Sequence, residues 1–224
     1  MGRVKDLNGG DYSRPRDRAP IFRPHDLVHI APEALQNEAP DWARAVLANG
    51  EPVVVRRGWR DGNRLPVGVR GASRDRRHAM QVAPEHICGA VITPESLVES
   101  AAPQRAADVP ALAALVELRA LMTPWAGAWG IGGAVGYELA SGVAACHEDS
   151  DIDLLLRLLE RPDTAALRRL AAQLAELPVR CDLQMETPAG GVALADWLSE
   201  AADVLVKSDQ GPYLAADPWR RGNL

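Results

Sequence analysis

The sequence is poor in cysteine and has no long apolar run. Its three cysteines, Cys88, Cys146 and Cys181, are widely separated, and none belongs to a C-x-x-C pair. A disulfide framework or a zinc ribbon requires paired cysteines, so neither is expected and a reduced, cytoplasmic setting is predicted. No segment approaches the roughly 18 consecutive apolar residues of a membrane-spanning helix, and no apolar signal region follows the N-terminal charges. We therefore expect a soluble protein with no membrane partner.

The sequence also lacks the net positive charge that is typical of proteins that bind nucleic acid. Its formal net charge is -5. Because nucleic-acid-binding proteins usually present a net basic face to phosphates, no nucleic-acid partner is expected. Basic residues are nevertheless concentrated between positions 56 and 77, where eight arginines stand against two aspartates. This cluster could still bind one local anion.

The length and the composition allow one large domain or two smaller ones. The chain has 224 residues, of which 47% are hydrophobic, and this is enough for a buried core. Residues 1–22 combine scattered charges with Gly and Pro and have no apolar period, which predicts a disordered tail. We interpret residues 23–105 as a small N-terminal α+β module and residues 106–224 as a second domain. The predicted fold class is α/β (α+β), with a mixed sheet flanked by helices.

Apolar periodicity predicts the helices and strands of both parts. In the first part we expect one helix and a two-stranded hairpin, and in the second part strands and helices that alternate. The expected helices span residues 40–48, 111–122, 134–140, 164–177 and 194–201. The expected strands span residues 52–57, 65–69, 129–132, 152–158, 179–186 and 203–207.

Two acidic residues stand at the start of the apolar strand 152–158. Asp151 and Asp153 flank Ile152, so their carboxylates project from one face with Cα atoms roughly 6.6 Å apart. Two ionised carboxylates this close repel each other, and Mg²⁺, which prefers oxygen ligands, would relieve the repulsion. Asp182, on the polar face of the later strand, is the expected third ligand, with Glu186 as the alternative. These residues are the candidate catalytic and metal-binding group.

Gly132 and Gly133 lie between a short strand and a short helix. Glycines at this point let the backbone approach a phosphate closely, beside the free N–H groups of the helix N-terminus. We therefore expect the two glycines to hold a triphosphate. No G-K-[ST] follows a Gly-rich loop, and no G-x-G-x-x-G motif is present, so these two competing phosphate-binding motifs are not indicated.

The order of these features resembles the signature of the polymerase-beta-like nucleotidyltransferase superfamily. That signature consists of an apolar residue and two small residues, a helix, a loop, and then Asp-apolar-Asp-apolar. The resemblance implies two cations that orient a hydroxyl for in-line attack on an α-phosphate, with release of pyrophosphate. Gly133 stands where the commoner form has Ser, so no hydroxyl contact to the phosphate is expected from this position.

Four separate segments narrow the resemblance to one family. Residues 65–79, 133–142, 150–157 and 204–219 are similar, in this order, to the malonate decarboxylase holo-acyl-carrier-protein synthases, which are phosphoribosyl-dephospho-CoA transferases. The likeness extends from Arg23 almost to the end of the chain. It implies a nucleotidyltransferase (EC 2.7.7 type) that moves a prosthetic group from 2'-(5''-triphosphoribosyl)-3'-dephospho-CoA to a serine of an acyl carrier protein. The acidic pair of the family matches Asp151 and Asp153, and Asp182 follows from the geometry of the superfamily.

Other polar residues have both a functional and a structural interpretation. Arg70, Arg74 and Arg77 could bind the phosphates of the donor or an acidic carrier protein, or they could form a solvated charge run. The five histidines show no ligand spacing, so structural or surface roles are favoured for them. His147, in the loop before Asp151, could nevertheless act as a base or contact a phosphate. Lys207 could likewise contact a phosphate or lie on the surface.

Two other functions stay open at this point. The first is a different Mg²⁺-dependent nucleotidyltransferase that uses an ordinary nucleoside triphosphate. The second is a non-catalytic protein that docks the carrier as an assembly factor. The three hypotheses differ in the donor they require and in whether the aspartates are needed for function.

Overall fold

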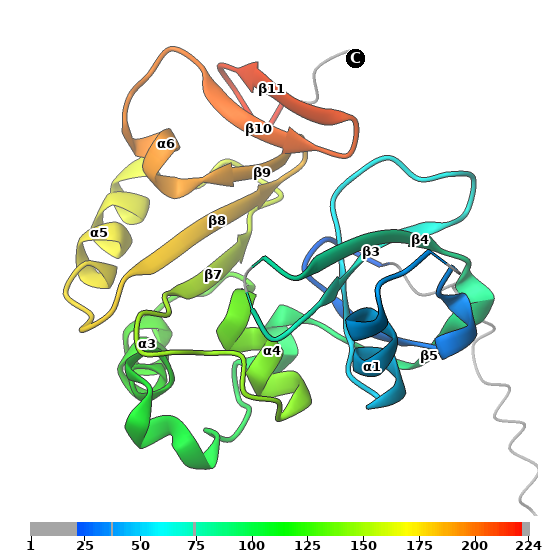
Figure 1. Cartoon of the computed structure of the whole chain (residues 1–224). Coiled ribbons are helices and arrows are strands. Elements are labelled where there is room, and N and C mark those ends of the chain that lie inside the picture. The colour runs from blue at the N-terminus through cyan, green and yellow to red at the C-terminus, as the bar shows by residue number, and fades with distance from the viewer. Residues whose placement is uncertain (1–21, 37, 74, 221–224) are drawn as a thin grey trace, which may run out of the picture.

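A computed structural model describes residues 22–36, 38–73 and 75–220. Most of the predicted tail, residues 1–21, lies outside the described residues, as does Arg74. The chain forms two β-sheets, each with its own hydrophobic core, and the two halves lie side by side in Figure 1. The expected mixed α/β fold is confirmed.

The N-terminal half is built on a five-stranded antiparallel sheet in the order β4-β3-β2-β1-β5. Helix α1 (Asp41–Ala48) buries Ala43, Val46 and Leu47 in the core of this half. The strands are β1 (Leu27–Ile30), β2 (Val53–Val55), β3 (Leu65–Arg70), β4 (Arg77–Val82) and β5 (Ile87–Ile92). The 3-10 helices are η1 (Pro32–Ala34), η2 (Pro84–His86), η3 (Pro94–Leu97) and η4 (Gln104–Asp108).

The C-terminal half is built on a six-stranded mixed sheet in the order β11-β10-β9-β8-β7-β6. Strand β7 pairs with β6 in the antiparallel direction and with β8 in the parallel direction. The strands are β6 (Trp129–Ile131), β7 (Ile152–Arg157), β8 (Cys181–Thr187), β9 (Gly190–Ala193), β10 (Val204–Ser208) and β11 (Gly211–Ala215). The helices are α2 (Pro110–Ala113), α3 (Leu115–Met122), α4 (Gly133–Ser141), α5 (Thr164–Leu174) and α6 (Leu194–Leu198).

The predicted elements are present, with bounds that differ by a few residues at their ends. The helix predicted over residues 111–122 is two helices, because the chain leaves α2 at Ala114 and starts α3 directly after it. The helix predicted over residues 164–177 begins with the expected Asp163 cap, whose side chain accepts a hydrogen bond from the Ala165 N–H, but it ends at Leu174. Strands β1, β4, β5, β9 and β11 were not predicted. Strands β4 and β5 are the edges of their sheet and contain a single buried residue, Val82, so they lack the apolar alternation that marks a half-buried strand.

Ionic side chains join the two halves. The guanidinium of Arg157, at the end of β7, donates to Glu95 over 2.8 Å and lies 4.0 Å from Asp26, which is fully buried. Glu186 of β8 contacts Arg57 of the N-terminal half. The hydroxyl of Tyr137 on α4 also donates to Glu51 over 3.0 Å. These contacts fix the N-terminal sheet beside α4 and the central strands β7 and β8.

None of the helices that the structure describes has the length and the apolar character needed to cross a membrane.

Candidate functional site

The N-terminus of α4 packs directly against Asp153. The Gly132 N–H donates to the Asp153 carbonyl over 2.8 Å, and Gly133 has a left-handed backbone with φ 59°. A β-carbon at position 133 would overlap the Asp153 carboxylate. Because only glycine has no β-carbon, this residue lets the helix begin in contact with the carboxylate. The predicted glycine bend therefore meets Asp153.

The three predicted aspartates lie at the same end of two neighbouring strands. Asp153 of β7 and Asp182 of β8 are register partners in the parallel pair, and Asp151 directly precedes β7. Burial raises the pKa of Asp153, and the charges of Asp151 and Asp182 raise it further. The site therefore concentrates negative charge around Asp153 and disfavours the ionised form of its carboxyl.

Asp182 is held by a neighbouring arginine. Both Asp182 carboxylate oxygens accept hydrogen bonds from Arg180, one of them over 2.8 Å. In the part of the chain that the structure describes, no group of three or more His, Cys, Asp or Glu side chains is arranged to hold a metal ion. A cation shared by all three aspartates would require the exposed Arg180 side chain to release Asp182.

Glu186, the alternative third carboxylate, belongs to the joint between the halves. Arg57 donates to one of its oxygens, and the Gln184 amide donates to the other over 2.6 Å. Burial raises the pKa of Glu186, but the contacts and charges of the nearby His25 ring and Arg57 guanidinium outweigh this effect and lower the pKa to about 2. Its charge is already neutralised, so the geometry favours Asp182 beside Asp153.

Helix α4 also fixes the loop that leads to Asp151. The fully buried Glu138 carboxylate accepts hydrogen bonds from the Ala145 and Cys146 N–H groups, each over 2.8 Å, and from Arg105. Two backbone donors and one guanidinium compensate its buried charge. One helix therefore carries the glycine bend and anchors the chain that approaches Asp151.

His147 in this loop is exposed, and it lines none of the three cavities near the site.

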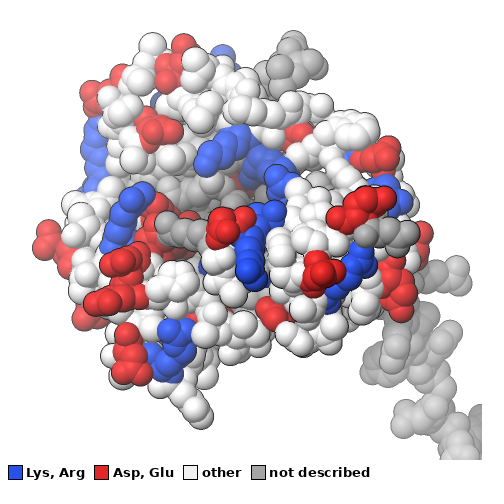
Figure 2. All heavy atoms as spheres, in the orientation of Figure 1, with Lys and Arg blue, Asp and Glu red and all other residues white. Residues whose placement is uncertain are grey.

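A cavity of about 550 Å³ lies between the N-terminal sheet and α4. Gly132 and Gly133 line it from the C-terminal half, and Arg70 and Arg77 line it from β3 and β4. Figure 2 shows Lys and Arg side chains gathered where the two halves meet around a hollow. The cavity has the positive charge and the backbone N–H groups that suit a polyphosphate.

Arg70 is more enclosed than Arg77. It donates to the Ala145 carbonyl over 3.2 Å, and its guanidinium lies 5.5 Å from the centroid of the Tyr137 ring. Burial and the neighbouring Arg77 lower the pKa of Arg70, while the charge of Asp153 is among the influences that raise it. Its charge therefore acts on the carboxylate site. Arg74 lies outside the described residues.

Two further cavities touch the aspartates. A small one of about 110 Å³ is lined by Gly133, Asp153, Asp182 and two more residues of β7, together with His25 and Gln184. A larger one of about 770 Å³ lies beside β8, α5 and α6 and is also lined by Asp153 and Asp182. Lys207 of β10 lines this larger cavity. The 770 Å³ cavity therefore reaches two of the carboxylates, whereas the 550 Å³ cavity is lined by the neighbouring Gly133 but by none of the three aspartates.

The N-terminal half contributes residues that the sequence did not indicate as part of the site. His25 and Arg56 line the 550 Å³ cavity, and Arg57 fixes Glu186. The pair Pro24-His25 is a turn signal, but a single sequence does not reveal which distant residues such a turn approaches. The contact between the turn and β8 arises only from the docking of the two halves.

Each half of the chain matches a known protein-family model. Residues 23–94 match the family model described as phosphoribosyl-dephospho-CoA transferase MdcG N-terminal domain. Residues 96–218 match the model described as phosphoribosyl-dephospho-CoA transferase MdcG C-terminal domain. The two matches together cover nearly all of the chain that the structure describes.

Curated relatives from several bacteria are similar over almost their whole length. The phosphoribosyl-dephospho-CoA transferases of Pseudomonas aeruginosa and Azotobacter vinelandii are each 45% identical over 88% of this chain, which covers 93% and 94% of the relatives. The phosphoribosyl-dephospho-CoA transferase of Pseudomonas syringae pv. tomato is 39% identical over 91% of this chain and 96% of its own length. No solved structure matches the chain.

Substitution of the second glycine tests the contact with Asp153. We expect Gly133→Ala to lower the free energy of unfolding by about 2–4 kcal/mol, because it adds a clash with a buried carboxylate to the cost of a left-handed alanine. The matched control is Gly142→Ala, since Gly142 also has a positive φ, 71°, but open space around its Cα. The control should cost only about 1–2 kcal/mol. Equal losses in urea unfolding would show that Gly133 does not press on Asp153.

Because the pKa of Asp153 is raised, we predict that a neutral side chain at this position stabilises the fold, and that the gain in stability depends on pH. The pKa of this carboxyl is higher in the folded state than its ordinary value of 3.8. The fold therefore loses stability as the pH rises above 3.8 toward the pKa of the folded state. We therefore expect Asp153→Asn to be more stable than the wild type at pH 7 in the presence of a chelator. The difference should shrink as pH falls toward 3, and urea unfolding at both pH values measures it. The exposed Asp209→Asn is the control, and a destabilised Asp153→Asn at pH 7 would contradict the account.

Proposed function

Because this chain belongs to the phosphoribosyl-dephospho-CoA transferase family MdcG, we propose that the transfer takes place where the glycine bend meets the three aspartates. The chain is a phosphoribosyl-dephospho-CoA transferase, an enzyme of the nucleotidyltransferase type. Its acceptor in this proposal is a serine of the malonate decarboxylase acyl carrier protein. Its donor is 2'-(5''-triphosphoribosyl)-3'-dephospho-CoA, and pyrophosphate leaves.

The observation that carries the placement is the contact between Gly133 and Asp153. It places the free N–H groups at the start of a nine-residue helix next to a largely buried carboxylate of the site. A triphosphate bound at the helix N-terminus would therefore present its α-phosphate to the aspartates. No second place among the described residues combines a glycine bend with neighbouring carboxylates in this way.

The aspartates fit a magnesium site in charge and in chemistry. Asp151 and Asp153 would hold the ion, and Asp182 would join them once Arg180 releases it. Carboxylate oxygens are ligands that Mg²⁺ prefers when phosphates supply the others. When bound, Mg²⁺ would supply charge neutralisation for the phosphates and a fixed orientation of the reacting oxygens. The requirement for Mg²⁺ is part of our proposal.

The charge of the 550 Å³ cavity suits the pyrophosphate that leaves the donor. Arg70 and Arg77 would neutralise the β- and γ-phosphates, while Gly132 and Gly133 admit them to the backbone N–H groups of α4. In an in-line displacement the attacking oxygen enters opposite the leaving pyrophosphate. The serine would therefore approach Asp153 from the side away from the basic cavity, where the 770 Å³ cavity opens. We also propose a cytoplasmic location, since Cys88, Cys146 and Cys181 are all free.

A mass measurement of the carrier tests this function. The protein is incubated with the triphosphoribosyl donor, Mg²⁺ and the apo carrier protein, and the carrier should gain the mass of one prosthetic group. We expect Asp151→Asn and Asp153→Asn to slow the transfer at least roughly 100-fold, because each removes an electrostatic partner of the reacting phosphate. Asp149→Asn, an exposed neighbour in the same loop, should transfer at the wild-type rate.

Four results would contradict the proposal. The first is that the carrier gains no mass with an active donor, and the second is that the transfer persists in a chelator. The third is incorporation of a label from ATP without the CoA-derived donor, which would favour an ordinary nucleotidyltransferase. Normal transfer by both aspartate variants would show that the chemistry takes place elsewhere.

A further inference from the structure

His25 occupies a turn position that favours glycine. The Asp26 N–H donates to the Arg23 carbonyl over 3.1 Å, and the turn between them contains Pro24 and His25. His25 has φ 75°, which is the left-handed conformation of the third residue of a type II turn. Glycine or asparagine is usual there, so a histidine at this place is an outlier that calls for a functional reason.

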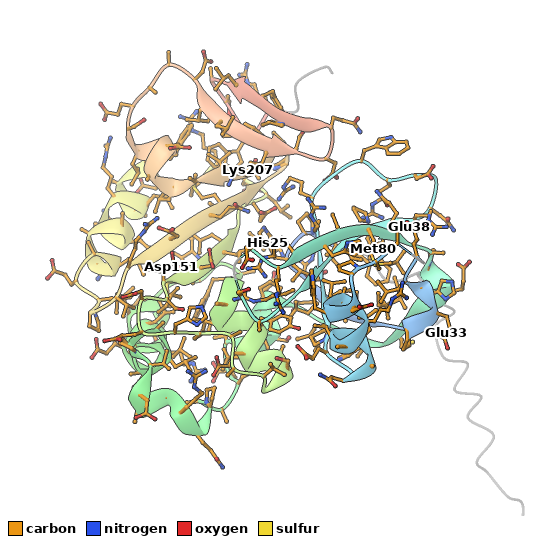
Figure 3. All side chains as sticks on the ribbon, viewed as in Figure 1. His25, Glu33, Glu38, Met80, Asp151 and Lys207 are labelled. Atoms are coloured by element: carbon orange, nitrogen blue, oxygen red, sulfur yellow. The ribbon has the colours of Figure 1, made fainter. Side chains whose placement is uncertain are left out.

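The turn is held from both sides, so the position of the histidine is fixed. The Asp26 carboxylate accepts a hydrogen bond from the Arg23 N–H over 2.8 Å, and the His25 N–H donates to the Val55 carbonyl over 2.9 Å. Asp26 is itself fully buried. The side chain of His25 therefore leaves a rigid backbone and points from the N-terminal half toward β8, as the label in Figure 3 indicates.

The contacts of the ring determine which nitrogen carries a hydrogen. The Gln184 amide nitrogen lies 2.8 Å from His25 Nε2, and the same amide donates to Glu186 over 2.6 Å. An amide nitrogen is only a donor, so Nε2 of the neutral ring accepts and the ring hydrogen is on Nδ1. In the protonated ring both nitrogens carry hydrogens, with the Glu186 carboxylate 3.5 Å away. Nδ1 is therefore a donor in either state, and no described residue accepts from it.

His25 also marks the passage from the basic cavity to the aspartates. Among the residues that the structure describes, only His25 and Gly133 line both the 550 Å³ cavity and the small cavity at Asp153 and Asp182. His25 does not line the 770 Å³ cavity on the other side. Its side chain is 34% exposed, and its charge lowers the pKa of Asp153. The ring thus faces the path that the donor's phosphates would follow.

We propose that His25 is a catalytic residue that donates a hydrogen bond from Nδ1 to the leaving pyrophosphate. The inference rests on the proposed function and adds a group from the N-terminal half to it. The serine Oγ forms a bond to the α-phosphorus, and the bond from that phosphorus to the bridging oxygen breaks. The electron pair stays on the pyrophosphate, and the serine proton passes to water. His25 keeps its hydrogen and stabilises the charge that develops on the pyrophosphate oxygens.

Two substitutions separate this role from a structural one. His25→Gly removes the ring and relaxes the left-handed backbone, so the turn should stay folded. We expect its kcat to fall about 100-fold and the inhibition constant of pyrophosphate, measured with Mg²⁺, to rise about 10-fold. The KM for the carrier should not change. His25→Asn also tolerates this conformation and keeps an amide donor, so it should recover part of both losses.

The control is His29→Ala, because His29 lines none of the three cavities. It should leave kcat and the affinity for pyrophosphate unchanged. A role confined to the contact with Gln184 and Glu186 predicts a lower Tm of His25→Gly with unchanged affinity for pyrophosphate, and this result would overturn the inference. Asp153→Asn is measured in parallel. If it abolishes transfer while His25→Gly behaves as wild type, only the role of His25 is lost; if Asp153→Asn is also normal, the proposed function fails.

Discussion

The arrangement of the site depends on the close contact between the start of helix α4 and Asp153. Without a β-carbon at position 133, the helix begins against the carboxylate of the central strand. The parallel pairing of β7 with β8 then places Asp182 beside Asp153. Burial and repulsion raise the pKa of Asp153 at this point, so the fold maintains a charge that is unfavourable until a cation or another positive group compensates it. The site is therefore assembled at some cost in stability, as is common for functional sites.

The N-terminal half completes the site. Its sheet contributes Arg70 and Arg77 to the basic cavity, and its first turn contributes His25. The ionic joint around Arg157 and Glu186 keeps these groups in place, and the low pKa of Glu186 keeps that carboxylate ionised through the neutral range. Because the groups that suit the phosphates come from one half and the carboxylates from the other, neither half alone provides the whole arrangement.

Local signals in the sequence predicted the elements that carry the carboxylates. Each of these signals lies within a single helix or strand: the apolar run after Asp153, the alternation around Asp182 and the cap at Asp163. The structure confirms all three elements. The edge strands β4 and β5 carry no such pattern, since all of their residues except Val82 are exposed or only partly buried. The contribution of His25 was missed for a different reason: it depends on contacts between residues 159 positions apart, which periodicity does not report. The roles of the aspartates, glycines and arginines remain predictions.

The most direct test is to locate a bound divalent cation. Crystals grown with Mn²⁺ and pyrophosphate, measured at the manganese absorption edge, would show each ion by its anomalous signal. Our account predicts an ion between the carboxylates of Asp151 and Asp153, with pyrophosphate reaching from the ion to the N–H groups at the start of α4. An ion held instead at Glu186, or pyrophosphate bound away from Gly133, would contradict it.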